Sequence, residues 1–160
     1  MKKIASILAL GVLLASCGEK KEEKKDGFEI NRTKTETKAV NPETKEVPVD
    51  LSNKGVGPIT TLELNADIDA KMATAGEEKF KALCTACHMV DKRMIGPALK
   101  GVTKRRSPEW IMNMIINPDK MIKEDPIAKA LLKEYNNAIM FNQNLSEEDA
   151  RSILEYLRTL

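Results

Sequence analysis

From about residue 70 onward, apolar residues recur at the spacing of amphipathic helices. Helices are expected over residues 77–84, 108–116 and 126–136 and from Ser146 to the C-terminus. Ser107 and Asp125 precede two of these as N-caps, and Ser146 forms an S-x-x-D capping pattern with Asp149. No internal repeat or convincing hairpin interrupts the pattern. The sequence therefore predicts an all-α folded unit over residues 73–160.

The helical stripes identify the expected core. Their apolar members are Ile111, Met114 and Ile115, then Ile127, Ala130, Leu131 and Leu132, and finally Ile153, Leu154, Tyr156, Leu157 and Leu160. Aromatic residues make up only 4% of the chain, which is thin for a core built from side chains alone. A bound apolar cofactor could fill the remaining space.

The N-terminus has the pattern of a secretory signal peptide. Two lysines precede an uncharged apolar run, residues 4–16, which is shorter than the ~20 residues that a membrane-spanning helix needs. The run ends in L-A-S followed by Cys17, which resembles a bacterial lipobox. We expect residues 1–16 to be a lipoprotein signal peptide and Cys17 to be lipidated. The alternative is an ordinary signal peptide with a chance cysteine.

A polar segment separates Cys17 from the helical unit. Lys, Glu and Thr dominate up to residue 46, and such a segment cannot bury enough apolar surface to offset the entropy lost on ordering. Residues 17–72 are therefore expected to form a lipidated N-terminus and flexible charged linker. Residues 47–70 are ambiguous, because residues 61–64 could pack onto the domain as a short strand or strap.

Composition limits the classes of function. The chain has 160 residues, enough for one ordinary domain, and its net charge of +2 gives no indication of nucleic-acid binding. Three cysteines and one histidine are the residues that point to chemistry.

Cys84-Thr85-Ala86-Cys87-His88 is a C-x-x-C-H motif, which indicates covalent haem attachment. On a helix, two thiols three positions apart lie on one side, where each can add to a haem vinyl group. The histidine that follows presents its imidazole to the iron. A thioredoxin-like C-x-x-C would need a βαβ context, and a zinc site would need four ligands. If Cys17 carries lipid and one haem c takes Cys84 and Cys87, no cysteine remains free for a disulfide or a nucleophile.

The flanking residues resemble those of class I cytochromes c. Gly76, Phe80 and Cys84 recur at four-residue spacing, as in the N-terminal helix of that family, where the glycine permits a close crossing by the C-terminal helix that carries Tyr156. Residues 96–99 match the family's G-P-x-L stretch. The resemblance implies the class I fold around one haem, and a carbonyl at or before Pro97 that accepts the His88 N–H. It extends, more weakly, to small lipoprotein cytochromes of Bacteroidetes-type bacteria.

With His88 as the proximal ligand, no second histidine remains for the opposite side of the iron. The sixth ligand is then methionine, lysine, water or absent. Met140, six residues before the last helix cap, is the expected ligand, because the family's methionine loop precedes that helix; Phe141 stands where proline is usual. Met121 is the second choice. Trp110 is expected either to donate its N–H to a haem propionate or to be an ordinary core residue.

The resemblance implies an electron carrier, not an enzyme, that passes single electrons between respiratory partners such as a terminal oxidase or nitrous-oxide reductase. The alternatives are a fixed haem subunit of a larger oxidoreductase complex and a haem sensor or peroxidase with an open sixth site. Neither nucleic acid nor a small-molecule substrate is expected. The haem domain is expected in the periplasm, or at the cell surface, held to a bacterial membrane by its lipid.

Basic residues cluster near the motif. Lys79 and Lys81 lie just upstream of it, and Lys100, Lys104, Arg105 and Arg106 form a second group. They are either ordinary solvated charges or a surface that steers an acidic partner.

Overall fold

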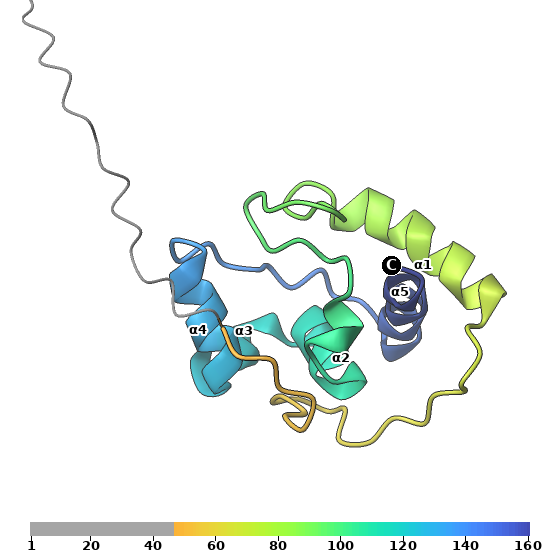
Figure 1. Ribbon diagram of the computed structural model, residues 1–160, viewed down its shortest axis with the longest axis horizontal. Coiled ribbons are helices and arrows are strands. Elements are labelled where there is room, and N and C mark those ends of the chain that lie inside the picture. Colours follow the sequence, from red (N-terminus) through yellow and green to blue (C-terminus); the bar gives the residue numbers. More distant parts are fainter. Residues whose placement is uncertain (1–46) are drawn as a thin grey trace, which may run out of the picture. The chain divides into compact units, whose positions relative to one another are not determined.

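The computed structural model describes residues 47–160, and this part of the chain is helical (Figure 1). Its elements are α1 Ala70–Leu83, the 3₁₀ turn η1 Val102–Lys104, α2 Pro108–Ile116, α3 Pro118–Glu124, α4 Pro126–Glu134 and α5 Glu147–Arg158. Within these residues the extended pairing is a single parallel bridge between Asp50 and Arg106. The predicted all-α class is confirmed. The expected signal peptide, Cys17 and the start of the linker lie outside the described residues.

Helices α1 and α5 cross at close range, at the position that the glycine pattern predicts. A Cβ atom added to Gly76 would overlap the backbone carbonyl of Ser152. One turn further along each helix, the rings of Phe80 and Tyr156 pack in a tilted arrangement with centroids 5.3 Å apart. Because the two backbones touch, α1 is fixed against the buried stripe of α5, and the residues that follow α1 are positioned by this contact.

The helices differ from the expected ones in three respects. Helix α1 begins at Ala70, seven residues before the expected start, because the Asp69 carboxylate accepts from the Met72 N–H and caps it. Helix α3 adds a helix where none was expected, between residues 116 and 126. Proline also suits the first position of a helix, and Pro118 starts α3 there. Helix α4 ends at Glu134, before two left-handed asparagines.

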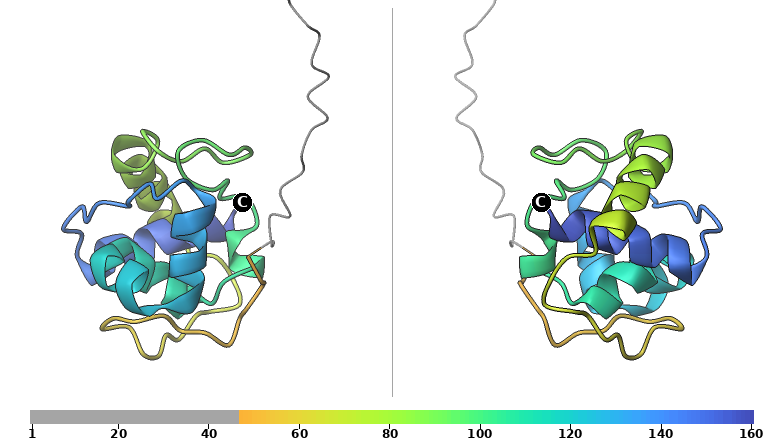
Figure 2. Two further views of the ribbon diagram at one scale, coloured as in Figure 1. Left: turned by 90° about the vertical axis from the view of Figure 1, so that its left-hand side faces the viewer. Right: turned by 90° about the vertical axis from the view of Figure 1, so that its right-hand side faces the viewer.

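Residues 47–69, here called the strap, wrap around the outer side of α2 and α3 before joining α1 (Figures 1 and 2). The expectation that the linker stays flexible to residue 72 is therefore wrong for this part. The strap places Ile59 in the core and packs Val47, Val56, Leu62 and Leu64 against it. Polar side chains of the helical unit also bind its backbone. For example, the Ser107 hydroxyl donates to the Asn53 carbonyl at 2.6 Å.

Asn113 is the main attachment point of the strap. Its side chain is fully buried, donates to the carbonyls of Lys54 (2.9 Å) and Ile59 (2.8 Å), and accepts from the Ile59 N–H (3.0 Å). Gly57 lies against the same amide, where a Cβ would overlap it. Both donors and one of the two acceptor lone pairs of this buried side chain thereby bind main-chain groups of the strap.

A second attachment lies at the end of α5. Arg151 and Arg158 both donate to the buried carboxylate of Glu155, and Arg158 also donates to the carbonyl of Asn65 at 2.7 Å. Burial opposes ionisation of Glu155, but the hydrogen bonds from the two arginines outweigh it and lower the pKa of the carboxyl. No helix among residues 47–160 is both long and apolar enough to cross a bilayer.

Replacing Gly76 with Ala should force α1 and α5 apart. We expect Gly76→Ala to lower the free energy of unfolding by about 3 kcal/mol, since backbone cannot move aside as a flexible side chain can. Urea unfolding followed by circular dichroism measures this. Thr74→Ala, on the exposed face of α1, should change stability by less than about 0.5 kcal/mol. Equal effects at the two positions would refute the close crossing.

Replacing Glu155 with Gln should destabilise the protein in a pH-dependent way. At pH 7 we expect a loss of about 2 kcal/mol, because two charged hydrogen bonds are weakened. The folded-state pKa of Glu155 is depressed, so its contribution is present above the ordinary value of 4.5 and is lost as pH falls through the folded pKa. The stability difference between the wild type and Glu155→Gln should therefore shrink towards pH 3. A constant difference would contradict this assignment.

Candidate haem site

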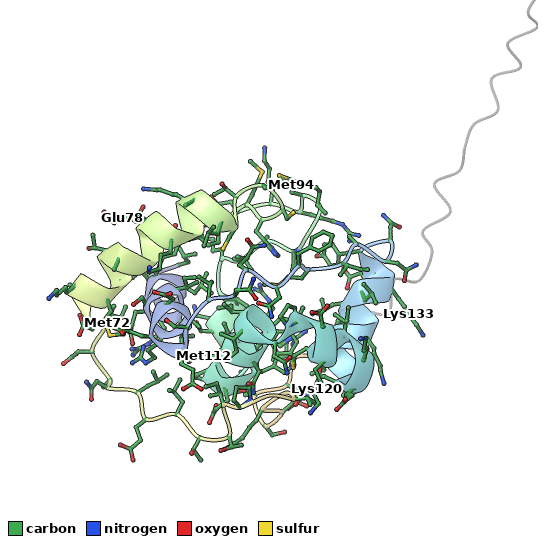
Figure 3. The ribbon with its side chains drawn as sticks, turned by 180° about the vertical axis from the view of Figure 1, so that it is seen from behind. Met72, Glu78, Met94, Met112, Lys120 and Lys133 are labelled. Atoms are coloured by element: carbon green, nitrogen blue, oxygen red, sulfur yellow. The ribbon has the colours of Figure 1, made fainter. Side chains whose placement is uncertain are left out.

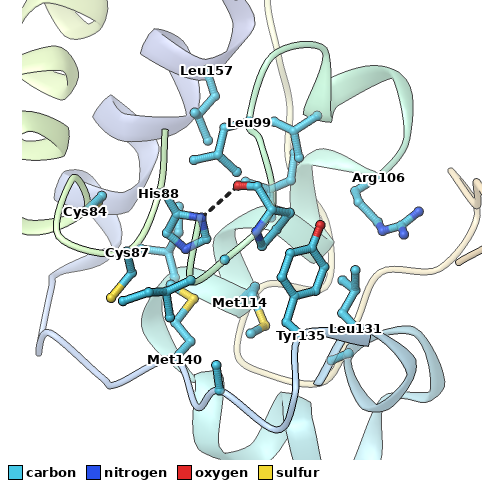
Figure 4. A pocket seen from close by; sticks show the side chains of 18 of the residues that line it. Cys84, Cys87, His88, Leu99, Arg106, Met114, Leu131, Tyr135, Met140 and Leu157 are labelled. Atoms are coloured by element: carbon cyan, nitrogen blue, oxygen red, sulfur yellow. Dashed lines mark hydrogen bonds between the residues drawn. The ribbon is translucent and has the colours of Figure 1, made fainter. Parts of the chain in front are cut away.

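One largely apolar cavity opens between α1, the loop that follows it, and the faces of α2, α4 and α5 (Figure 4). Its apolar lining includes Phe80, Leu99, Ile111, Met114, Ile115, Leu131, Leu132, Ile153 and Leu157. The faces predicted as core for α2 and α4 are thus in large part the walls of this cavity. The low aromatic content noted in the sequence is thus explained, because part of the interior is a cavity that a cofactor can fill.

The C-x-x-C-H motif lies in the turn directly after α1. Cys84 is the C-cap of the helix, and its carbonyl accepts from the N–H groups of both Cys87 (3.1 Å) and His88 (2.9 Å). These bonds keep near-helical spacing beyond the end of α1, so all three side chains line the same cavity. Burial, with a smaller contribution from Cys87, raises the pKa of the Cys84 thiol to about 11. Two thiols and one imidazole at the wall of an apolar cavity suit a covalently held haem.

His88 is fixed by the residues of the G-P-x-L stretch. Its Nδ1 lies 3.1 Å from the Pro97 carbonyl, the hydrogen bond that the resemblance implies (Figure 4). With Nδ1–H as the donor, the lone pair of Nε2 is free to bind a metal. Gly96 packs against the ring, and a Cβ there would stand 2.5 Å from Cε1 of His88. The glycine is needed because only a bare backbone fits beside the imidazole.

The methionines of the described chain differ in whether they line the cavity. Met140 lines the cavity together with His88, and so does Met114 of α2. Met121 is fully buried elsewhere, with its sulfur accepting from the Val56 N–H at 3.0 Å. Met112 is buried within the helical unit, and Met94 lies on the outer loop (Figure 3). Met140 and Met114 are therefore the two methionines of the described chain that share the cavity of His88.

The loop that carries Met140 is bounded by asparagines in the left-handed backbone region. Asn136 and Asn137 have φ of 56° and 59° where α4 ends, and Asn144 has φ of 54° two residues before the cap of α5. Asparagine tolerates this region better than other non-glycine residues. Asn142, in the same loop, donates to the Ile116 carbonyl at 3.3 Å and so connects the loop to α2.

Trp110 lines the cavity with its ring but uses its N–H elsewhere. The indole donates to the buried Asp125 carboxylate at 3.0 Å, and the same oxygen accepts from the Ala128 N–H as the cap of α4. Asn53 of the strap donates to the other carboxylate oxygen at 2.7 Å. The N–H is thus engaged within the protein, as in the core alternative, and a bound group meets only the ring of Trp110.

Polar side chains that the sequence did not single out as site residues gather at one end of the cavity. Arg105, Arg106 and Tyr135 line it there, and in Figure 4 Arg106 and Tyr135 lie at the end away from Cys84 and Cys87. In the sequence, Arg105 and Arg106 were noted only as members of a basic cluster. That pattern does not distinguish a buried arginine from one exposed to solvent.

Half of the charges in the two basic clusters form ion pairs in the described part of the chain. Lys79 binds Asp149 at 2.8 Å, Lys81 binds Glu77 at 2.8 Å, and Lys100 binds Asp91 at 3.1 Å. Exposed apolar side chains lie at the cavity mouth instead, namely Leu83, Ile95, Ile139 and Phe141. The surface around the site is therefore more apolar than basic, which does not favour the steering interpretation.

Comparison with known proteins agrees with the site. A search of solved structures finds a cytochrome c from Rhodothermus marinus, with 51% sequence identity and a TM-score of 0.63 over 64% of this chain and 88% of that one. An engineered form of it, bound to a carbene intermediate, matches with 51% identity and a TM-score of 0.60 over the same shares. Cytochrome c2 of Rhodopseudomonas palustris is 53% identical over 38 residues, which cover 24% of this chain and only 27% of that relative.

The family model for cytochrome c matches residues 73–160, the expected domain and more than half of the chain. The predicted resemblance is thereby confirmed, and the pair of thiols at the cavity wall accounts for the covalent cofactor. The chain belongs to the cytochrome c family, whose cofactor is covalently bound haem c.

Proposed function

We propose that this protein is a membrane-tethered monohaem cytochrome that transfers single electrons between respiratory-chain partners. The observation that carries the proposal is that His88 and Met140 line one apolar cavity from different parts of the chain. His88 and Met140 would hold the haem iron through an imidazole nitrogen and a thioether sulfur. With both of these ligands provided by the protein, little would have to rearrange when an electron arrives, and a methionine ligand would raise the reduction potential relative to histidine.

The proposed activity is that of a carrier and not of an enzyme. Cys84 and Cys87 are taken up by the cofactor, and His88 is the one histidine of the chain. A terminal oxidase or a nitrous-oxide reductase is a suitable electron acceptor by analogy with the family. Partners approach the apolar rim of the cavity, where Phe141 is 71% exposed. Such a contact depends on burial of apolar surface more than on charge, so it resists added salt.

Export and lipid on Cys17 place the haem domain in the periplasm in this proposal. Because the strap packs onto the domain, the tether proper extends at most over residues 18–46. Those 29 residues, if flexible, have an end-to-end distance of about 30 Å. The domain thereby stays concentrated near membrane partners, which increases the frequency of productive encounters.

Met140→Ala should remove the sulfur ligand. We expect the oxidised protein to lose its weak far-red sulfur-to-iron absorption band, with haem still attached. Met114→Leu and Met121→Leu are the matched controls and should keep the band. Loss of the band in Met114→Leu, with retention in Met140→Ala, would assign the sixth ligand to Met114 instead. Carbon monoxide binding by the reduced wild type would indicate an open site.

Gly96→Ala should displace the His88 ring, since the added methyl group has no room beside Cε1. We expect the hydrogen bond to Pro97 to lengthen, which makes the imidazole a less basic ligand and stabilises the oxidised iron less. The reduction potential should therefore rise by an amount equivalent to at least a threefold change in the redox equilibrium. Spectroelectrochemical titration measures the shift. Lys92→Ala, an exposed change in the same loop, should leave the potential unaltered. An unaltered potential in both variants would show that Gly96 does not hold the ring.

Cys17→Ser should abolish the lipid anchor. Two or three acyl chains hold a protein stably on a membrane, so their loss should move the cytochrome out of the membrane fraction or block its processing. Fractionation and the mass of the mature protein report the result. An unchanged mature mass would refute lipidation. Persistence of the unlipidated protein in a membrane complex would favour the alternative of a fixed haem subunit.

A further inference from the structure

We propose that Arg93 is a positioning residue that keeps the Met140 sulfur on the iron, because it joins the loop after His88 to the start of the segment that carries Met140. This inference rests on the proposed function, since it takes His88 and Met140 to hold one haem. It assigns a role to a side chain that does not line the cavity and that the sequence pattern did not single out.

The guanidinium of Arg93 makes three contacts with the end of α4. Nη2 donates to the main-chain carbonyl of Glu134 at 2.5 Å, and Nη1 forms an ion pair with the Glu134 carboxylate at 3.3 Å. Its Cζ atom lies over the Tyr135 ring, 3.9 Å from the centroid. A planar cation can make all three contacts at once, because its donors lie in the plane and its face stacks on the ring. We call this set of contacts the Arg93 bridge.

On its other side the bridge starts from a loop that is fixed beside His88. Arg93 lies between the C-x-x-C-H motif and the G-P-x-L stretch. The Gly96 N–H donates to the Cys87 carbonyl at 2.8 Å, which joins the two ends of this loop directly next to His88. The Gly96 carbonyl accepts from the Met94 N–H at 3.0 Å, which closes the loop further. The loop is therefore held to the histidine side of the cavity, and Arg93 extends from it.

The segment that carries Met140, residues 138–145, has few other attachments and is here called the methionine loop. Within the part of the chain that the structure describes, one hydrogen bond joins it to another helix, from the Asn142 side chain to the end of α2 at 3.3 Å. Two of its apolar side chains, Ile139 and Phe141, point largely into solvent. A segment with so few contacts opens easily unless its ends are held.

The Arg93 bridge holds the first of these ends. The Ala138 N–H donates to the Tyr135 carbonyl at 3.0 Å, so the start of the methionine loop is joined to a residue that the guanidinium covers. Tyr135, Met140 and His88 all line the cavity (Figure 4). The bridge therefore connects the histidine side of the cavity to the methionine side. Movement of Met140 away from the iron would pull against it.

The expected effect is moderate, because the side chain of Arg93 is 48% exposed. Exposed ion pairs and exposed cation–aromatic contacts each stabilise a structure only weakly. Here they act together at one end of a segment that is otherwise loosely held. Removal of the whole bridge should increase the rate at which the methionine loop opens by about fivefold.

The first test measures how fast an added ligand replaces the methionine. Excess imidazole is mixed with the oxidised, full-length, haem-loaded protein, and loss of the far-red sulfur-to-iron band is followed by stopped-flow absorption. At saturating imidazole the rate approaches the rate at which Met140 leaves the iron. Arg93→Gln should raise this rate about fivefold relative to the wild type.

Two further variants separate the bridge from the charge. Lys92→Gln removes the same charge from an exposed neighbour in the same loop and should change the rate by less than about twofold. Arg93→Lys keeps the charge but lacks the planar group, so it should raise the rate by at least about twofold. A rate in Arg93→Gln no higher than in Lys92→Gln would overturn the proposal, and so would a wild-type rate in Arg93→Lys.

The second test does not depend on which atom binds the iron. Amide hydrogen exchange of the same haem-loaded proteins reports opening of the backbone directly. In Arg93→Gln the amides of residues 139–142 should exchange at least about twofold faster than in the wild type, while those of α5 stay unchanged. Equal exchange in the methionine loop would contradict the bridge. Equally faster exchange in α5 would show a global loss of stability and would also contradict it.

Failure of this inference is distinguishable from failure of the proposed function. Failure of the function would appear in the wild type, as absence of the far-red band or as a protein that exchanges no electrons with a redox mediator. Failure of the inference would leave both properties intact while the imidazole rates and the amide exchange of the Arg93 variants matched those of the wild type.

Discussion

The contact of α1 with α5 at Gly76 is the constraint on which the rest of the site depends. With no side chain at that position, the backbone of α1 rests on the Ser152 carbonyl. Helix α1 therefore ends where its C-cap, Cys84, reaches the cavity, and the turn of the C-x-x-C-H motif starts from a fixed point. Helix α5 contributes Ile153 and Leu157 to the same wall, so one helix pair both supports and lines the site.

Helix α2 connects the cavity to the strap, because one side of the helix lines the cavity and another side binds the strap. Ile111 and Ile115 line the cavity, whereas Asn113 binds the main chain of the strap. Asp125 links them, since its carboxylate joins the Trp110 ring of the cavity wall to Asn53 of the strap and to the start of α4. The cofactor space and the strap are thus built on one shared set of hydrogen bonds, which makes the strap part of the site and not an appendage.

Local patterns predicted the parts of the site that are local in sequence. The motif at residues 84–88 depends on short spacing, and the caps at Ser107, Asp125 and Ser146 depend on single residue types next to a helix. The hydrogen bond from His88 to Pro97 was implied by the family resemblance of the G-P-x-L stretch. Polar contacts between residues far apart in the chain have no comparable local pattern in the sequence. The N–H of Trp110 donates to a carboxylate fifteen residues away. The strap is held by buried polar side chains of the helical unit as well as by apolar residues of its own such as Ile59. Counting the apolar residues of a segment does not reveal its hydrogen bonds to distant polar side chains.

The pairing of α1 with α5 also governs when the domain can close during its synthesis. The chain is made from its N-terminus, so α1 and the motif emerge before α2, α3 and α4, and α5 emerges last. Until then the crossing surface at Gly76 has no partner, and the cavity lacks the wall that α5 provides. Until α5 packs against α1, the cavity that buries Cys84 and raises its pKa is incomplete, so both thiols are then open to solvent. Docking of the last helix is thus the step that encloses the two thiols.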